Sequence, residues 1–122
     1  MVLIDYSLND RRIGLEAASE AWTTMIRMSL DRGVKVILLT STSDLAAQIG
    51  DPDDPLERQA SQVRRLASEW KVGLVDSLEA FRRASDRVTL SGLMSQNNHP
   101  NAAGHKLVAA EILKYLESKP LE

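Results

Sequence analysis

Val34-Lys35-Val36-Ile37-Leu38-Leu39-Thr40 is the stretch of this 122-residue sequence that decides its fold. Its centre is a continuous apolar run that is rich in β-branched residues, without the polar alternation of a half-exposed strand. Such a run is typical of a strand buried on both faces, as in a parallel sheet. Gly33 stands directly before it, where a preceding helix would end. The stretch therefore predicts the centre of an α/β sheet.

Helical patterns alternate with two more strand candidates around this stretch. Apolar runs at 2–6 and 72–75 predict strands, and the periodicity of residues 15–32 and 56–70 predicts helices between the strands. A last helix is expected over 101–118. The positions expected to be buried in the three helices are Ala18, Trp22, Met25, Ile26, Leu56, Ala60, Val63, Leu66, Ala67, Trp70, Val108, Ile112 and Leu116. Because strands joined through helices run parallel, this order predicts a three-layer, doubly wound α/β sheet in one domain over residues 1–122.

The composition favours a soluble globular domain, with 43% apolar and 26% charged residues. The sequence has no cysteine, which excludes a disulfide, a thiolate zinc site and a cysteine nucleophile and suits a reducing, cytoplasmic compartment. A net charge of −2 without a basic stripe argues against a nucleic-acid partner. We expect neither a signal peptide nor a membrane partner, because Asp5 interrupts the first apolar run and no run is long enough to span a bilayer.

Residues 41–55 form a long connection after the central strand, with Gly50, two prolines and three aspartates. Open α/β sheets bind their ligands at the carboxyl ends of the strands, so this connection is expected to shape a pocket. The alternative is a solvated loop whose acidic residues cap the next helix.

Two polar clusters stand where this fold exposes side chains. Ser7-Leu8-Asn9-Asp10 follows the first strand, and Asn97-Asn98-His99-Pro100-Asn101 precedes the last helix. The Asn9 amide could stabilise an oxyanion and His99 could act as a general base, although each residue taken alone is better explained as part of a turn or loop. Both clusters belong to the edge at which α/β enzymes collect reacting groups, so they could meet in space.

Taken together, Leu8-Asn9-Asp10 and the run His99-Pro100-Asn101-Ala102-Ala103-Gly104-His105 resemble the SGNH/GDSL hydrolase family. That family has a Gly-x-Asn-Asp block with an oxyanion-hole asparagine, and an Asp-x-x-His-Pro block with the catalytic histidine. The order of the intervening helices and strands also fits the family's layout. The resemblance implies a flavodoxin-like α/β fold and an esterase or acylhydrolase that acts on a small ester without a cofactor.

The resemblance also implies roles for individual residues. Asn9 takes the oxyanion-hole role and His99 the general-base role, and Gln96 stands where the family has the aspartate that supports the histidine. An amide can orient an imidazole through its carbonyl oxygen but offers no charge to stabilise the imidazolium. The residues expected to border the substrate are Ser7, Asp10, Ser41 and Asn98.

Three further positions bear on this comparison. Ser7 stands where the family has glycine, and we expect it to be a tolerated replacement that keeps the backbone amide. Gly104 is expected to permit close packing of the last helix. His105 is expected to pack against the ends of the strands.

The family's Gly-Asp-Ser-Leu block, which holds the nucleophile, does not occur in these residues, and the sequence resembles the C-terminal two-thirds of the family domain. No sequence argument brings Ser41, Ser43, Ser91 or Ser95 to the histidine, so we expect the serine to come from an upstream segment or from another chain. The strand at 2–6 would then be an open edge. It is expected to pair with its own copy in a two-fold homodimer.

Two other functions remain open. The chain could be a catalytically inactive, truncated relative that serves as an oligomeric binding or scaffold module. A metal site built from Asp5, Asp10, His99 and His105 ranks last, because these residues lack the spacing of metal ligands on one helix face, and no metal is expected.

Overall fold

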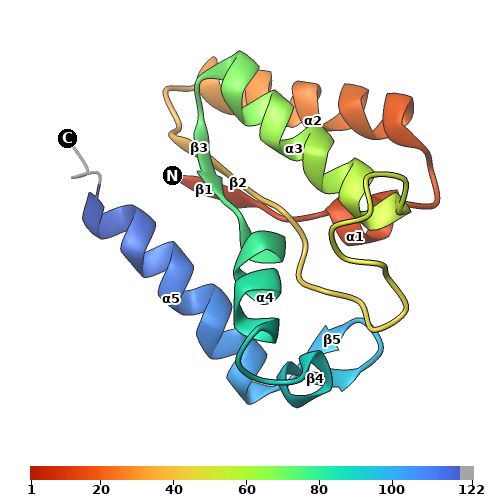
Figure 1. Ribbon diagram of the computed structural model, residues 1–122. Coiled ribbons are helices and arrows are strands. Elements are labelled where there is room, and N and C mark those ends of the chain that lie inside the picture. Colours follow the sequence, from red (N-terminus) through yellow and green to blue (C-terminus); the bar gives the residue numbers. More distant parts are fainter. Residues whose placement is uncertain (119–122) are drawn as a thin grey trace.

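The computed structural model describes residues 1–118, which form helices on both sides of a small parallel sheet (Figure 1). The last four residues of the predicted domain lie outside the described residues. The elements in chain order are β1 (Val2–Ile4), α1 (Ser7–Asp10), α2 (Leu15–Leu30), β2 (Val36–Leu39), α3 (Pro55–Trp70), β3 (Gly73–Val75), α4 (Ser77–Ser85), the 3₁₀ helix η1 (Leu90–Leu93), β4 (Met94–Gln96), β5 (His99–Pro100) and α5 (Ala102–Ser118).

The three strands pair in parallel in the order β1-β2-β3, with β2 in the centre, which confirms the predicted sheet. Leu38 of β2 lies opposite Ile4 of β1 and Leu74 of β3. Helices α2 and α3 lie on one face of the sheet and α5 lies on the other (Figure 1). All four residues of β2 are buried, as expected for a strand covered on both faces.

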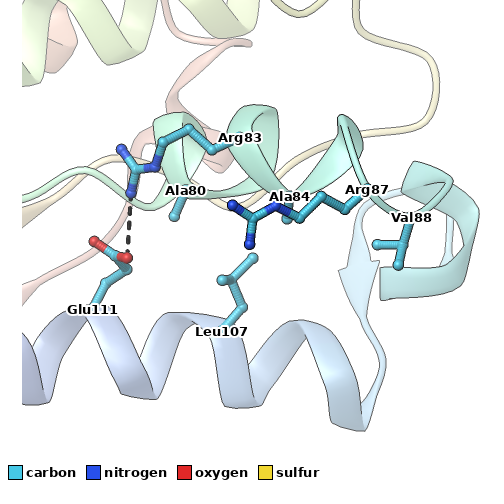
Figure 2. Close-up of a pocket in the computed structure, with 7 residues that line it drawn as sticks. All are labelled: Ala80, Arg83, Ala84, Arg87, Val88, Leu107 and Glu111. Carbon is cyan, nitrogen blue, oxygen red and sulfur yellow. Dashed lines mark ion pairs between the residues drawn. The ribbon is translucent and has the colours of Figure 1, made fainter.

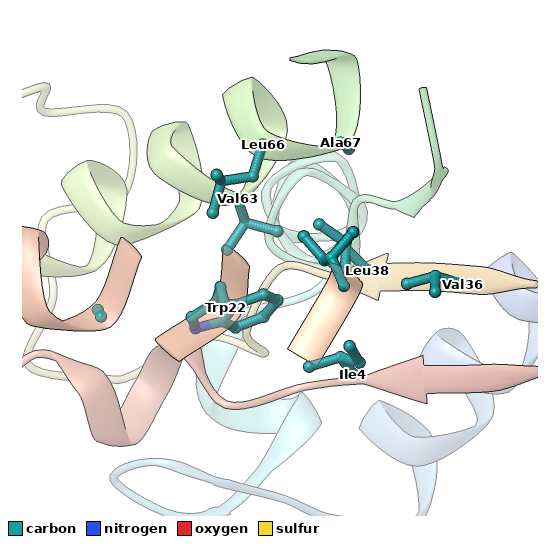
Figure 3. Packing of buried hydrophobic residues seen from close by; sticks show 9 residues of the cluster. Ile4, Trp22, Val36, Leu38, Val63, Leu66 and Ala67 are labelled. Atoms are coloured by element: carbon teal, nitrogen blue, oxygen red, sulfur yellow. The ribbon is translucent and has the colours of Figure 1, made fainter. Parts of the chain in front are cut away.

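Trp22 of α2 is the largest side chain of the core beneath α2 and α3, and it is 1% exposed. Ile4, Leu38 and Val63 surround it, so it joins β1 and β2 to both helices (Figure 3). Its indole nitrogen donates to the Asp10 carboxylate at 2.6 Å, which satisfies the one polar atom that the ring buries. This contact also fixes α1 against α2.

On the opposite face, α5 covers β2 and β3 but leaves β1 open. Ile37 and Val75 are buried against half-buried Val108 and Ile112 of α5. Leu3 is the partner of Ile37 in the sheet, yet it is 39% exposed. Within residues 1–118, β1 pairs with β2 alone. The strand at 2–6 is thus an edge in this chain, and the homodimer through it stays a prediction.

The segment before α5 is more regular than its sequence indicates. The sequence has no strand signal there, whereas residues 90–100 form η1 and the antiparallel hairpin β4-β5. The Asn101 amide donates to the Gly92 carbonyl at 2.9 Å, and the Asn101 backbone N–H donates to the Leu93 carbonyl at 3.0 Å. Contacts with the start of α5 therefore hold the segment, rather than strand propensity.

Asp76 ties the carboxyl ends of the strands to α3 and α4. Its carboxylate accepts from the Thr40 hydroxyl at 2.9 Å, from the Arg64 guanidinium at 2.7 and 3.1 Å, and from the Glu79 amide at 3.2 Å. The last bond caps the N-terminus of α4. Burial alone would raise the pKa of Asp76, but the bonds from Arg64 and Thr40 hold this pKa below its ordinary value.

Replacement of Asp76 by alanine is expected to lower the free energy of unfolding by about 2–3 kcal/mol, because α4 loses its cap and Arg64 and Thr40 lose their acceptor. The matched control Glu69→Ala breaks an exposed ion pair with Arg65 on α3 and is expected to cost about 0.5 kcal/mol or less. Urea unfolding of both variants measures the difference, and equal losses would contradict the role of Asp76.

The same comparison has a pH dependence. Since the folded-state pKa of Asp76 lies below the unfolded-state value, its contribution is complete above about pH 4 and is lost as the pH falls through the folded-state pKa. The stability difference between wild type and Asp76→Ala should therefore shrink below about pH 4.

Candidate functional site

The structure brings the two polar clusters of the sequence to one hollow of about 600 Å³. Asn9 of α1 and Asn98 of the β4-β5 turn both line it. The complete lining is Leu8, Asn9, Arg11, Arg12, Pro55 and Asn98. Residues almost 90 positions apart along the chain therefore share one surface, at the carboxyl side of the sheet.

The connection after β2 holds the two sides of this hollow together. Asp44 is buried and accepts from the Arg11 guanidinium, which follows α1, at 2.9 Å. The next amide, that of Leu45, donates to the Asn97 carbonyl in the hairpin turn at 2.7 Å. The connection thus shapes the pocket, as expected, and Asp54 in the same connection also caps α3 through the Leu56 amide at 2.8 Å.

Asn9 is well placed to serve a ligand. Helix α1 is anchored to α2 and α3, because the Asp10 carboxylate accepts from Trp22 and the Asp10 carbonyl accepts from the Gln59 amide at 3.1 Å. Asn9, one residue earlier, is exposed and its side chain makes no hydrogen bond within residues 1–118. Its amide is free to donate. The Asp10 carboxylate, by contrast, is taken up by Trp22 and does not line the hollow.

His99 and Gln96 are cross-strand partners in the β4-β5 hairpin. Directly opposed residues of a hairpin project to the same face, so the pairing allows the Gln96 and His99 side chains to share one face of the hairpin. No hydrogen bond joins the two side chains in the described part of the chain. Both residues are exposed, and His99 adjoins the hollow through Asn98 without lining it.

The first turn of α5 fixes the position of the hairpin. The Asn101 side-chain oxygen accepts from the amides of Ala103 at 2.9 Å and Gly104 at 3.1 Å, which caps the helix. A Cβ on Gly104 would overlap the Leu93 carbonyl oxygen and lie 2.8 Å from the Pro100 side chain. Gly104 thus permits the close packing that the sequence predicts.

The serines at the carboxyl edge are inaccessible in this structure. Ser7 and Ser43 are 0% exposed, and Ser41 is 1% exposed and donates to the Thr42 carbonyl. No hydroxyl among them reaches the hollow, so the geometry gives no support to substrate contacts by Ser7 or Ser41. Ser95 is exposed, but its hydroxyl donates to the His99 carbonyl at 3.0 Å and not to the imidazole.

Two other expectations can be compared with the structure. His105 is exposed in the first turn of α5, so the expectation that it packs against the strand ends is wrong. The first turn of α5 packs on η1 and β5 instead of the strand ends, since Gly104 in this turn meets the Leu93 carbonyl and Pro100. Within residues 1–118, no group of three or more acidic or histidine side chains converges as metal ligands would.

No helix of the described residues is long and apolar enough to cross a membrane.

Sequence reasoning missed Arg11, Arg12 and Pro55, which line the hollow. The doubled arginine directly after Asn9-Asp10 is a signal that could have identified the first two. Asp44 has no such signal, because its partner Arg11 lies 33 positions away.

A separate groove of about 370 Å³ lies between α4 and α5 (Figure 2). Ala84 and Leu107 are part of its lining, and Arg83 pairs with Glu111 across it at 3.2 Å. It shares no lining residue with the hollow at Asn9, so it does not belong to the candidate site.

Comparisons of the sequence with known proteins find no relative, since no protein-family model matches it and no curated protein is detectably similar. Comparisons of the structure do. The acetylxylan esterase Axe2 from Geobacillus stearothermophilus superposes with a TM-score of 0.72 at 21% identity, over 94% of this chain and 58% of that one. A protein of the lipolytic G-D-S-L family from Veillonella parvula superposes with a TM-score of 0.70 at 18% identity, over 92% and 60%. A putative GDSL-like lipase from Parabacteroides merdae gives 0.74 at 11%, over 96% and 61%.

These structures establish that the chain has the α/β fold of SGNH/GDSL esterases, as the sequence resemblance implies. The chain spans 58–61% of the length of these matched structures. Structures of Axe2 also exist for catalytic mutants in which a serine, an aspartate or a histidine is replaced by alanine. In that protein the aspartate precedes the histidine by three positions.

Gly104→Ala is expected to lower the free energy of unfolding by about 1–3 kcal/mol, although alanine is the better helix former, because the new methyl group displaces the hairpin. Gly92→Ala is the matched control, since a Cβ there meets Thr89 Oγ1 at 3.7 Å, an ordinary contact. Chemical denaturation of both variants tests this, and a Gly104→Ala protein as stable as Gly92→Ala would refute the packing.

Asp44→Ala is expected to loosen the bridge between Arg11 and the hairpin turn. The Leu45 amide, whose acceptor is Asn97, should exchange its hydrogen about tenfold faster or more, because the loop opens more often. Asp53→Ala provides the control in the same loop, since the Asp53 carboxylate makes no bond within residues 1–118. Amide exchange measured by NMR reports both, and unchanged exchange at Leu45 in Asp44→Ala would rule out the bridge.

Proposed function

We propose that this chain forms the oxyanion-hole and general-base half of an SGNH-type active site that hydrolyses a small ester. The observation that carries the proposal is that Asn9 and Asn98 line one hollow, with His99 next to Asn98 in the chain, in a fold shared with esterases and lipases. Asn9 offers an unpaired amide, and His99 offers an exposed imidazole directly before α5.

The proposed reaction uses a serine that lies outside these 122 residues. Its hydroxyl oxygen attacks the ester carbonyl carbon while His99 accepts the hydroxyl proton, and Asn9 donates to the oxyanion that forms. His99 then returns the proton to the leaving alcohol. A water molecule attacks the acyl-enzyme by the same route and releases the acid. The burial of Ser7, Ser41 and Ser43 supports a nucleophile from elsewhere.

Gln96 is the position at which this chain departs from the matched esterase. It stands three residues before His99, where Axe2 has an aspartate among its catalytic positions. We propose that the Gln96 side chain orients the His99 ring from the opposite strand, without the charge that an aspartate supplies. Turnover by this site would then be slower than that of an enzyme with a complete triad.

The second candidate function is an inactive relative that acts as an oligomeric scaffold. One observation favours it: within residues 1–118 one edge of β1 is unpaired, beside exposed Leu3 and Tyr6. An exposed edge strand is a template for pairing with another strand, most simply its own copy.

The variant His99→Ala, made in the protein expressed from its complete reading frame, should lower kcat for p-nitrophenyl acetate by about 100-fold or more, since a positioned general base contributes at least that much. His105→Ala is the matched control, because it removes the same type of side chain from an exposed position six residues later, in the first turn of α5. It should change kcat by less than about twofold.

Labelling with a fluorophosphonate, followed by mass mapping, locates the nucleophile in the same protein. The proposal expects a labelled serine outside residues 1–122. A label on Ser7, Ser41 or Ser43 would overturn this account of the nucleophile. Absence of any label, together with hydrolysis no faster than that of His99→Ala, would favour the scaffold.

A further inference from the structure

A second hollow, of about 430 Å³, adjoins the candidate site. Arg11 and Pro55 line both hollows, so the two are neighbours at these residues, and together they are called the arginine groove here. From Asn9 and Asn98 the groove runs past Pro55 to Arg58 in the first turn of α3. The lining of the second hollow is Arg11, Gly14, Leu15, Pro55, Arg58 and Gln59.

Every charged residue that lines this groove is an arginine, although the chain as a whole carries a net charge of −2. Arg11 is compensated by Asp44. Arg12 and Arg58 are exposed, and neither has an ion pair or side-chain hydrogen bond within residues 1–118. The groove therefore presents two uncompensated guanidinium groups, from two different elements, to whatever occupies it.

Three of the four acidic side chains near Pro55 accept hydrogen bonds from backbone amides of the loop, and the fourth, that of Asp53, is exposed. Asp54 accepts from the amides of Leu56 and Gln48, both at 2.8 Å. Asp51 accepts from the Asp53 amide, and Glu57 accepts from the Gly50 amide at 2.8 Å. None of the four carboxylates lines the groove, and none forms an ion pair with Arg12 or Arg58 within residues 1–118.

We propose that this groove binds the carboxylate of an anionic ester, with the ester bond at the Asn9 end and the carboxylate between Arg12 and Arg58. Guanidinium groups match the geometry of a carboxylate and are weakly hydrated, which favours this ligand over a neutral one. Two isolated cations suit one small anionic group rather than a polyanion, which requires a longer basic stripe. The ester part of the proposal rests on the proposed function, whereas carboxylate binding does not.

The experiment compares monomethyl succinate with dimethyl succinate, which differ by one carboxylate, in an NMR titration of the ¹⁵N-labelled protein. The carboxylate form should bind, with shifts at the Asn9 and Asn98 side-chain amides and at the Arg12 and Arg58 Nε groups. The neutral diester should bind several-fold more weakly. Added salt should weaken the carboxylate form alone, because its contact is between exposed charges.

Arg12→Gln and Arg58→Gln should each weaken binding of monomethyl succinate by roughly fivefold, which is the loss of one exposed charge contact. Arg65→Gln is the matched control on α3, where Arg65 pairs with Glu69 away from the groove, and it should leave binding unchanged.

Three results would overturn the proposal: no binding of monomethyl succinate at its highest soluble concentration, equal binding of the two esters, or equal binding by the arginine variants and Arg65→Gln. Tighter binding of inorganic phosphate at the same two arginines would replace the carboxylate by a phosphate. Since binding is read without turnover, loss of hydrolysis with binding intact counts against the proposed function alone.

Discussion

Burial of β2 on both faces is the constraint on which the rest of this structure depends. A strand without an exposed face needs a layer of helices on each side, and parallel neighbours need helical crossovers to reach them. Helices α2 and α3 supply one layer and α5 supplies the other. The strands consequently all end at one edge, where the Asp76 carboxylate accepts from both Thr40 and Arg64. The apolar residues are buried between the sheet and the helices, so the polar residues of the site lie at this edge.

The parts of the fold that sequence predicts well are those with a local periodic signal. The helical stripe around Trp22 and the unbroken apolar run of β2 each need only their own residues to be recognised. The β4-β5 hairpin has no comparable signal, because its strands are two or three residues long and their stability comes from Gly104 and Asn101 of the following helix turn. Such contacts exist only once α5 has docked, so a single sequence does not reveal them.

In the candidate site, too, the residues with a local sequence signal could be predicted, and those that depend on distant contacts could not. Asn9 and His99 could be identified because a turn after a strand and a turn before a helix are local features with a known place in an α/β sheet. The Arg11–Asp44 pair that joins their elements depends on a match between distant positions. The burial of Ser7 likewise depends on which way α1 turns after β1, and the anchoring of Asp10 by Trp22 decides that direction. Sequence thus indicates which chemical groups lie near the site better than it indicates which of them are exposed to a ligand.

In the proposed site, Gln96 offers no charge to stabilise the imidazolium of His99, which raises the barrier to turnover. In a serine protease, replacement of the aspartate beside the catalytic histidine by asparagine lowers turnover by about 10⁴, or roughly 5.5 kcal/mol, mainly through the wrong tautomer of the imidazole. A substrate carboxylate in the arginine groove would offset the imidazolium charge, but a charge pair in water is worth only about 1 kcal/mol even at about 4 Å. Orientation of the His99 imidazole therefore has the larger effect on turnover in the proposed site. The Ser95 hydroxyl on the His99 carbonyl and the Asn101 bonds to Gly92 and Leu93 hold the hairpin that carries the imidazole. In the proposed site, the rigid hairpin orients the His99 imidazole, as an aspartate would. Gln96 does not supply the negative charge by which an aspartate stabilises the imidazolium.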